Sequence, residues 1–254
     1  MDMSYKHPDR MKKYFDIYLE FDRSMVSKII SDKIEQKQKG YVCVVDGNVL
    51  TTSFKINEYK KIINGSSVNI CDGSSIALLL GVLHQKRFRT YTGPEIFLEL
   101  SQKNFSQYIL GNTDENLLLL QRKFDSLGMN QEKFRFKSIP FRKVGDFDYE
   151  SIANDIKLFS PDIVWVSLGA PKQEIFMSKL IRYLDKGVLF GIGAAVNLFL
   201  DSDNNKRAPR ILRVLNLEWL FRVIQEPGRV GKRALSYLAV LPDLIYQELK
   251  TIRN

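Results

Sequence analysis

The sequence has few of the residues that usually bind zinc or form disulfides. Its 254 residues include two cysteines and two histidines. Because structural zinc sites need several clustered cysteine or histidine ligands, this composition argues against a zinc site. Both cysteines, Cys43 and Cys71, lie in apolar runs that are typical of strands. We therefore predict buried, reduced thiols, which fit a cytosolic protein.

Long apolar runs are also missing. A helix that spans a membrane needs about 20 consecutive apolar residues. The nearest candidate, residues 188–200, contains two glycines and Asn197. Residues 1–23 are polar and charged throughout, unlike a signal peptide. We therefore expect any membrane contact to be peripheral.

Positive charge is in excess. The formal net charge is +9, while 44% of the residues are hydrophobic and 26% are charged. This composition predicts a globular protein with a substantial core. The charge suits an acidic partner, which could be nucleic acid, a phosphorylated small molecule or an anionic membrane surface.

Strand-like and helix-like segments alternate along most of the chain. The predicted strands are residues 14–21, 41–45, 68–71, 88–91, 107–110, 134–139, 163–166 and 187–192. Helical patterns fill most of the intervals, including one that begins at Ser24 as its N-cap. This alternation predicts an α/β fold with a mostly parallel, Rossmann-like sheet flanked by helices. No linker interrupts it, so residues 1–205 are predicted to form one domain.

Glycine-containing turns follow most of the predicted strands. They are Asp46-Gly47, Asp72-Gly73, Thr92-Gly93, Gly111-Asn112, Gly169-Ala170 and Gly193-Ala194. In a parallel sheet these turns would share one edge and line one crevice. None of them spells G-x-G-x-x-G, and the Walker A and G-x-S-x-G motifs are absent.

Residues 162–174 show the predicted arrangement most clearly. An apolar strand leads into small residues and then into a helix, with Pro171 in its first turn. Lys172 and Gln173 stand at the helix start, where outward N–H groups favour a phosphate. The alternative is an ordinary connection between a strand and a helix.

Residues 206–254 are predicted to form a basic, helical C-terminal appendage. The cations between residues 206 and 233 are Lys206, Arg207, Arg210, Arg213, Arg222, Arg229, Lys232 and Arg233. Leucines and aromatics are interleaved with them. Such a segment can lie on an anionic membrane, or it can pack on the domain with a solvated basic face. Nucleic acid is a third alternative, but no binding motif accompanies the charge.

Seven motifs occur in a fixed order. They are VVDGN (44–48), ICDG (70–73), TGPEIF (92–97), ILGNTDENL (109–117), VSLGAPKQE (166–174), GIGAAVNLF (191–199) and RAPR with LEWLFRVIQEPGR (207–229). This ordered set resembles the family of bacterial glycosyltransferases named after WecG, TagA and CpsF. The resemblance implies inverting transfer of a hexose or N-acetylhexosamine-type sugar from a UDP-sugar to a polyprenyl-diphosphate-linked sugar. It also implies teichoic acid, capsule or exopolysaccharide synthesis, at the inner face of the bacterial membrane, without a metal or other cofactor.

The resemblance also implies roles for individual residues. Asp72 would be the general base that deprotonates the acceptor hydroxyl. Asn48 matches a substrate-pocket residue, and Gln173 would contact the sugar or diphosphate. For all three, the alternative is hydrogen bonding within a turn or a helix cap.

Three positions depart from the family pattern. Asp46 stands where the family usually has threonine, and Asn197 stands where it often has aspartate. Arg89 lies one position before an expected arginine. If Asn197 reads the uracil or ribose, donor contacts would differ from the family pattern.

The leaving UDP needs stabilisation by N–H groups and cations. Candidates are the turns at Gly169 and Gly193, with Arg207 or Arg210 folding back from the appendage. The predicted substrate-binding set is completed by Gly93, Gly111, Asn112, Lys172 and Ala194.

Two other functions stay open at this point. One is a catalytically inactive nucleotide-binding module, with Asp46 and Asn197 as signs of a decayed site. The other is a nucleic-acid-binding protein, argued only from charge. The resemblance favours the sugar donor, the lipid-linked acceptor and the membrane as partners, without nucleic acid. The apolar residues of the appendage could also form contacts in a homo-oligomer.

Overall fold

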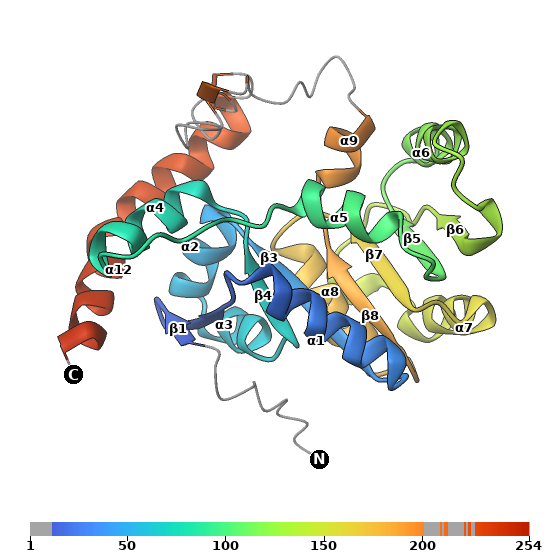
Figure 1. Ribbon diagram of the computed structural model, residues 1–254, viewed down its shortest axis with the longest axis horizontal. Helices are drawn as coiled ribbons and strands as arrows, with labels where there is room; N and C mark the ends of the chain where they lie inside the picture. The colour runs from blue at the N-terminus through green and yellow to red at the C-terminus, as the bar shows by residue number, and fades with distance from the viewer. Residues whose placement is uncertain are drawn as a thin grey trace. The chain divides into compact units, whose positions relative to one another are not determined.

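A six-stranded sheet is the centre of the fold (Figure 1). In this computed structural model, residues 12–200, 209, 211–212, 221, 223–224 and 227–253 are described. The sheet has the order β4-β3-β8-β7-β5-β6. Its strands are β3 (Lys39–Val45), β4 (Val68–Cys71), β5 (Gln107–Gly111), β6 (Phe134–Lys137), β7 (Ile163–Ser167) and β8 (Gly187–Gly191). The pairs β3–β8, β8–β7, β7–β5 and β5–β6 are all parallel, so the predicted α/β fold with a mostly parallel sheet is confirmed.

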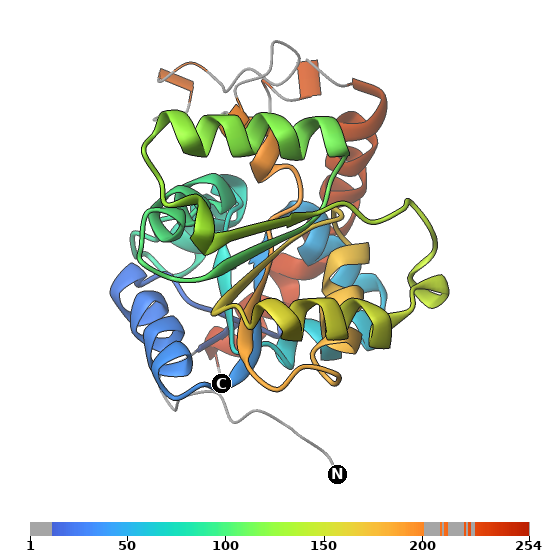
Figure 2. The same ribbon diagram turned by 90° about the vertical axis from the view of Figure 1, so that its right-hand side faces the viewer.

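The central strands are apolar because helices cover both of their faces. Every residue of β7 and β8 is buried, as expected for a parallel sheet inside an α/β fold. Trp165 of β7 packs edge-on against Phe97 and donates a hydrogen bond of 2.8 Å to Gln107. Figure 2 shows α6 (green) and α7 (yellow) on opposite faces of the sheet.

Helices connect most of the strands. They are α1 (Arg23–Glu35), α2 (Gly47–Lys55), α3 (Asn57–Asn64), α4 (Ser74–Leu83), α5 (Gly93–Ser101), α6 (Asp114–Ser126), α7 (Tyr149–Phe159), α8 (Lys172–Leu180), α9 (Ala195–Leu200) and α12 (Lys232–Arg253). Three short segments have other helical geometry: η1 (Gln131–Lys133), η2 (Val144–Asp146) and η3 (Pro227–Gly231). Asp46, Thr113 and Asp148 cap α2, α6 and α7 by accepting backbone N–H bonds.

Two predicted strands are wrong. The single strand predicted at residues 14–21 is replaced by a hairpin of β1 (Lys12–Tyr14) and β2 (Ile17–Leu19), because Phe15 and Asp16 adopt φ of 53° and 61°. Positive φ at both central residues is what a two-residue hairpin turn needs. Residues 88–91 contain no strand. This segment is instead attached to the end of β4, where the Tyr91 N–H donates to the Cys71 carbonyl at 2.9 Å.

The start of α1 also differs from the prediction. The helix begins at Arg23, and the carboxylate of Asp22 accepts bonds from the backbone N–H and the hydroxyl of Ser24 at 2.8 and 2.7 Å. Asp22 therefore takes the capping role predicted for Ser24. Aspartate and serine are both good N-caps, so the sequence pattern alone did not separate them.

The described residues group into two compact units. Unit 1 takes them from residues 1–26, 44–92 and 207–254, and unit 2 from residues 27–43 and 93–206. The C-terminal helix α12 thus belongs to the same unit as β4 and α2. The division into a catalytic domain of residues 1–205 and an appendage of residues 206–254 stays a prediction about function.

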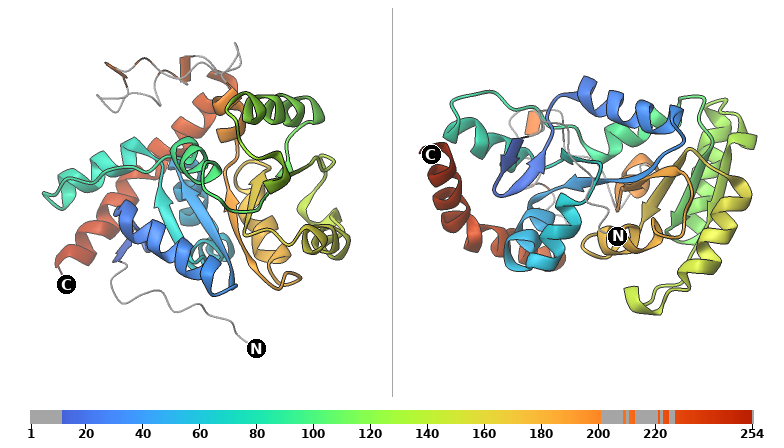
Figure 3. Two further views of the ribbon diagram at one scale, coloured as in Figure 1. Left: turned by 45° about the vertical axis from the view of Figure 1, so that its right-hand side comes forward. Right: turned by 90° about the horizontal axis from the view of Figure 1, so that it is seen from below.

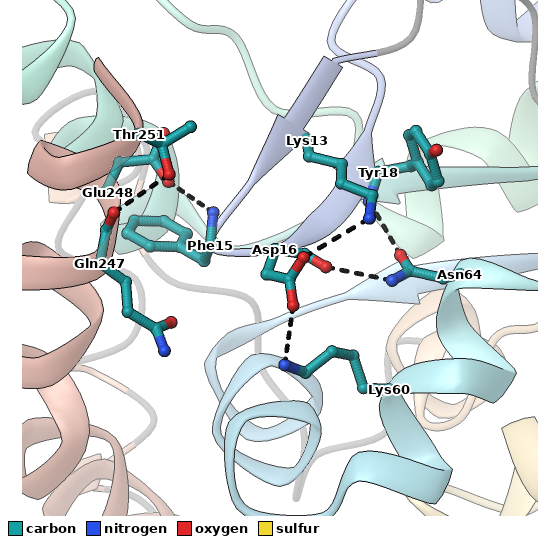
Figure 4. Close-up of polar contacts among 9 residues, drawn as sticks. All are labelled: Lys13, Phe15, Asp16, Tyr18, Lys60, Asn64, Gln247, Glu248 and Thr251. Atoms are coloured by element: carbon teal, nitrogen blue, oxygen red, sulfur yellow. Dashed lines mark hydrogen bonds and ion pairs between the residues drawn. The ribbon is translucent and has the colours of Figure 1, made fainter. Parts of the chain in front are cut away.

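Helix α12 is an integral part of unit 1. It lies beside α2 (Figures 1 and 3), and Val240, Leu244 and Glu248 are buried. The Glu248 carboxylate accepts a 2.6 Å bond from the Phe15 N–H (Figure 4) and lies 2.7 Å from the His84 ring nitrogen. Burial of this carboxylate is compensated by these partners, so α12 holds the β1–β2 hairpin and the end of α4 together.

Candidate functional site

Unit 1 brings two predicted turns together at the ends of β3 and β4. We call Asp46, Asn48 and Asp72, with the intervening glycines, the aspartate cluster. The N–H groups of Asp72 and Gly73 both donate to the Val45 carbonyl, at 2.9 and 3.3 Å. A Cβ atom on Gly73 would lie 3.6 Å from the Asp46 Cα. The two turns are therefore in direct contact.

Asp72 is half-buried at the carboxyl end of β4. The N-cap position of α4 belongs to Gly73 and not to Asp72, while hydrogen bonding within the turn stays the alternative role of Asp72. A partly exposed carboxylate at a strand end can approach a substrate hydroxyl and accept its proton. The position therefore suits a general base.

Asp46 and Asn48 differ in how their side chains are used. The Asp46 carboxylate accepts a 2.8 Å bond from the Val49 N–H and so caps α2. The side-chain nitrogen of Asn48 is buried and has no hydrogen-bond partner among the described residues. Buried amide groups are normally paired, so this donor is suited to a ligand.

Unit 2 brings three predicted turns together, at the ends of β5, β7 and β8. We call these turns and their side chains the turn network. Gly111 has φ of 96°, and a Cβ there would lie 2.8 Å from the Ser167 carbonyl, so glycine is required. The Ser167 hydroxyl donates to the Gly193 carbonyl at 2.7 Å. Asn112 donates to the Asn197 side-chain oxygen at 2.9 Å.

Gln173 joins two of these turns. Its side chain is buried, and its oxygen accepts bonds from the N–H groups of Gly169 and Gly193 at 3.1 and 2.9 Å. Its nitrogen donates to Glu174 at 2.8 Å. These bonds support the alternative that Gln173 fixes the turns. The N–H groups of Gly169 and Gly193, which were predicted to hold the diphosphate, are already used here.

The other predicted residues have separate surroundings. The Lys172 ammonium lies 4.2 Å from the centre of the Phe141 ring. Gly93 is buried at the start of α5, while Arg89 and Ala194 are exposed. Arg207 and Arg210 lie outside the described residues. The predicted convergence of all six turns on one crevice, and their contacts with substrate, stay predictions.

Arg23 was not predicted from the sequence. Its guanidinium donates to the Thr90 carbonyl at 3.0 Å and lies 4.6 Å from the centre of the Tyr91 ring. A cation thus reaches the segment where the resemblance led us to expect an arginine. Arg23 and Thr90 are 67 residues apart in the sequence, so no local sequence pattern could indicate this contact.

The cysteines show no sign of reactivity. Burial raises the pKa of the Cys43 and Cys71 thiols, and both are free and buried as predicted. Among the described residues, no group of three histidine, cysteine or carboxylate side chains could hold a metal ion. No helix in the described ranges has the length and apolar character needed to cross a membrane.

Comparisons with known proteins agree with the sequence motifs. Two relatives from Staphylococcus aureus are each named N-acetylglucosaminyldiphosphoundecaprenol N-acetyl-beta-D-mannosaminyltransferase. The one from strain MW2 is 28% identical over 203 residues, which cover 77% of this chain and 74% of the relative. The one from strain MRSA252 is 26% identical over 204 residues, with the same coverage. The profile of the glycosyl transferase WecG/TagA/CpsF family matches residues 17–254. Because this match takes in nearly the whole chain, the protein belongs to the WecG/TagA/CpsF family of glycosyltransferases.

Proposed function

We propose that the protein transfers a hexose or N-acetylhexosamine-type sugar from a UDP-sugar to a polyprenyl-diphosphate-linked sugar. The relatives' names support this, since they transfer N-acetylmannosamine to an N-acetylglucosaminyl diphosphate lipid. The observation that carries the proposal is the half-buried Asp72 carboxylate at the end of β4, in the same aspartate cluster as the Asn48 amide nitrogen, which has no partner among the described residues. The product would enter cell-surface polysaccharide synthesis.

The proposed reaction is a single displacement with inversion. The acceptor hydroxyl oxygen attacks the anomeric carbon, and its proton passes to the Asp72 carboxylate. The bond between the anomeric carbon and the UDP oxygen breaks on the opposite side, and its electron pair leaves with UDP. Asp72 must reach only the acceptor hydroxyl, so one carboxylate is enough.

The negative charge that develops on UDP would be stabilised by cations rather than a metal ion. Arg23 is exposed in unit 1, and Arg207 and Arg210 are further candidates from the basic segment. A guanidinium offers several donors in a planar fork that matches phosphate oxygens. These cations would act on the leaving group while Asp72 acts on the nucleophile.

A turnover assay tests this function. Purified protein is incubated with a lipid-linked acceptor analogue and a panel of UDP-sugars, and released UDP is measured. We expect release with at least one N-acetylhexosamine donor, and only when acceptor is present. Binding of UDP without any turnover across the panel would instead favour the inactive nucleotide-binding module.

We also propose peripheral attachment to the inner face of the membrane through the C-terminal segment. On α12, Leu235 and Leu238 are 69% and 52% exposed, next to Lys232 and Arg233. Leucines beside cations suit an anionic lipid surface. Removing residues 206–254 would also remove Val240, Leu244 and Glu248 from the core, so point substitutions are the better test.

Vesicle flotation measures this attachment. We expect Leu235→Ser/Leu238→Ser to lower binding to phosphatidylglycerol vesicles at least about fivefold, because apolar burial contributes roughly 1 kcal/mol or more per side chain. Leu118→Ser/Leu119→Ser on α6 is the matched control, with 49% and 42% exposure. Equal flotation of the α12 variant and the wild type would contradict the attachment site.

A further inference from the structure

A groove of about 490 Å³ lies on unit 1, beside the β1–β2 hairpin. It is lined by Lys12, Tyr14, Leu19, Glu20, Phe21, Asp22, Lys86, Arg87, Phe88 and Arg89. The volume is within the range of small-molecule sites. Only Arg89 among these residues was predicted to bind substrate, so the groove needs its own explanation.

The charges in the groove are unevenly paired. Its cations are exposed, and none of their side chains forms an ion pair or hydrogen bond with another described residue: Lys12, Lys86, Arg87 and Arg89. Its two carboxylates are engaged by the chain itself. Glu20 accepts bonds of 2.8 Å from the N–H groups of Phe21 and Asp22, and Asp22 caps α1. Four cations against two occupied carboxylates favour an anionic ligand.

The wall of the groove is aromatic. Tyr14, Phe21 and Phe88 pack edge to face, with ring centroids 5.6, 5.3 and 4.7 Å apart. Tyr14 is buried, whereas Phe21 and Phe88 keep part of their surface accessible. Such mutual packing fixes the rings and presents apolar surface next to the cations. A ligand with an anionic head and an apolar chain would satisfy both.

The groove is joined to the aspartate cluster through the chain. Arg89 is two residues before Tyr91, so their Cα atoms are at most about 7 Å apart. The Tyr91 N–H donates to the carbonyl of Cys71, which precedes Asp72. The backbone of Arg89 therefore lies within about 15 Å of Asp72. A sugar attached to a diphosphate in the groove could reach the base.

We propose that this groove binds the diphosphate of the lipid-linked acceptor, with the first isoprene units along the aromatic wall. The inference rests on the proposed function and assigns the acceptor to these residues. The cations contact the diphosphate oxygens, and Phe21 and Phe88 contact the chain. The sugar extends toward Asp72. The other source of the same chemistry is a phospholipid headgroup of the membrane.

Isothermal titration of the full chain with soluble probes tests the inference. Farnesyl diphosphate carries both the diphosphate and an isoprene chain, and inorganic pyrophosphate carries only the first. We expect farnesyl diphosphate to bind at least tenfold more tightly than pyrophosphate. Lys86→Glu/Arg87→Glu should weaken farnesyl diphosphate at least tenfold and leave UDP binding unchanged. Lys103→Glu/Arg122→Glu, on exposed residues of unit 2, makes the same charge change and should alter neither.

Three results would overturn the inference. The first is equal affinity of the protein for farnesyl diphosphate and pyrophosphate. The second is an equal loss of farnesyl diphosphate binding in the control variant Lys103→Glu/Arg122→Glu. The third is that Lys86→Glu/Arg87→Glu loses binding to phosphatidylglycerol vesicles but keeps farnesyl diphosphate binding. The last result would identify a phospholipid site. Asp72→Asn separates this inference from the proposed function, since it should bind farnesyl diphosphate normally while losing turnover. Binding without any dependence of turnover on Asp72 would leave the groove standing and reject the base.

Discussion

The turn network and the aspartate cluster use their polar groups in different ways. In the turn network of unit 2, Gln173 and Asn112 bond to neighbouring turns and side chains. In unit 1, the Asn48 amide nitrogen is buried without a partner among the described residues. Paired buried groups fix a scaffold, whereas an unpaired one costs stability unless a ligand completes it. We propose on this basis that the aspartate cluster carries substrate contacts, whereas the hydrogen bonds of the turn network fix its own loops.

Substitution of the predicted base should have the largest effect. Asp72→Asn keeps the shape of the side chain but cannot accept the hydroxyl proton. We expect UDP release to fall at least about a hundredfold, within the usual range for loss of a general base. Asp125→Asn, on an exposed aspartate of α6, is the control and should keep full activity. If both variants turn over equally, Asp72 is not the base.

Substitution of Gln173 should mainly affect folding. Gln173→Leu removes the acceptor of two N–H groups and the donor to Glu174, all in a buried position. We expect the free energy of unfolding to fall by about 2–4 kcal/mol, measured by urea denaturation. If Gln173→Leu instead keeps its stability and loses UDP binding, Gln173 contacts the ligand, and the contrast between the turn network and the aspartate cluster is wrong.

Asn48 should show the opposite behaviour. Asn48→Ala removes a donor that has no partner among the described residues, so the free energy of unfolding should change by less than about 1 kcal/mol. Loss of its proposed hydrogen bond to substrate should lower kcat/KM by about tenfold. If Asn48→Ala is as unstable as Gln173→Leu and has a normal kcat/KM, the contrast between the aspartate cluster and the turn network is wrong.

A smaller effect concerns the hairpin beside the groove. Burial would raise the pKa of Asp16, but Lys60 at 2.9 Å and Lys13 outweigh it, so the pKa is lowered (Figure 4). A carboxylate whose pKa is lower in the folded state stabilises the protein at pH values above its unfolded-state pKa. This stabilisation is lost as the pH falls through the folded-state pKa.

Because Asp16 is half exposed, the contribution is below about 1 kcal/mol. Asp16→Asn should therefore destabilise slightly at pH 7 and not at pH 2. Urea denaturation of the variant and the wild type at both pH values checks this. An equal difference in the free energy of unfolding at pH 7 and pH 2 would contradict the role of Asp16.

Much of the fold could be predicted from the sequence. The strand predicted at residues 68–71 agrees with the structure residue for residue, because an apolar run with turn residues after it marks its end. The hairpin at residues 12–19 was missed because its turn has no glycine or asparagine. The buried residues of α12 agree with the alternative that the C-terminal segment packs on the domain, which charge alone did not separate from a membrane-facing helix.

The site was only partly predictable. Strand ends indicated the turns that meet within each unit, since parallel strands end at one edge. Which side chains remain unpaired depends on contacts between distant segments, such as Arg23 with Thr90 or Gln173 with Gly193. No local pattern encodes those contacts. The groove likewise combines residues 12–22 with residues 86–89.

The most direct test is a crystal structure of the Asp72→Asn protein with UDP and an acceptor analogue bound. The account predicts that the Asn48 amide nitrogen donates to the bound sugar, while Gln173 still accepts from the N–H groups of Gly169 and Gly193. A structure in which Gln173 has turned onto the ligand and Asn48 contacts nothing would contradict it.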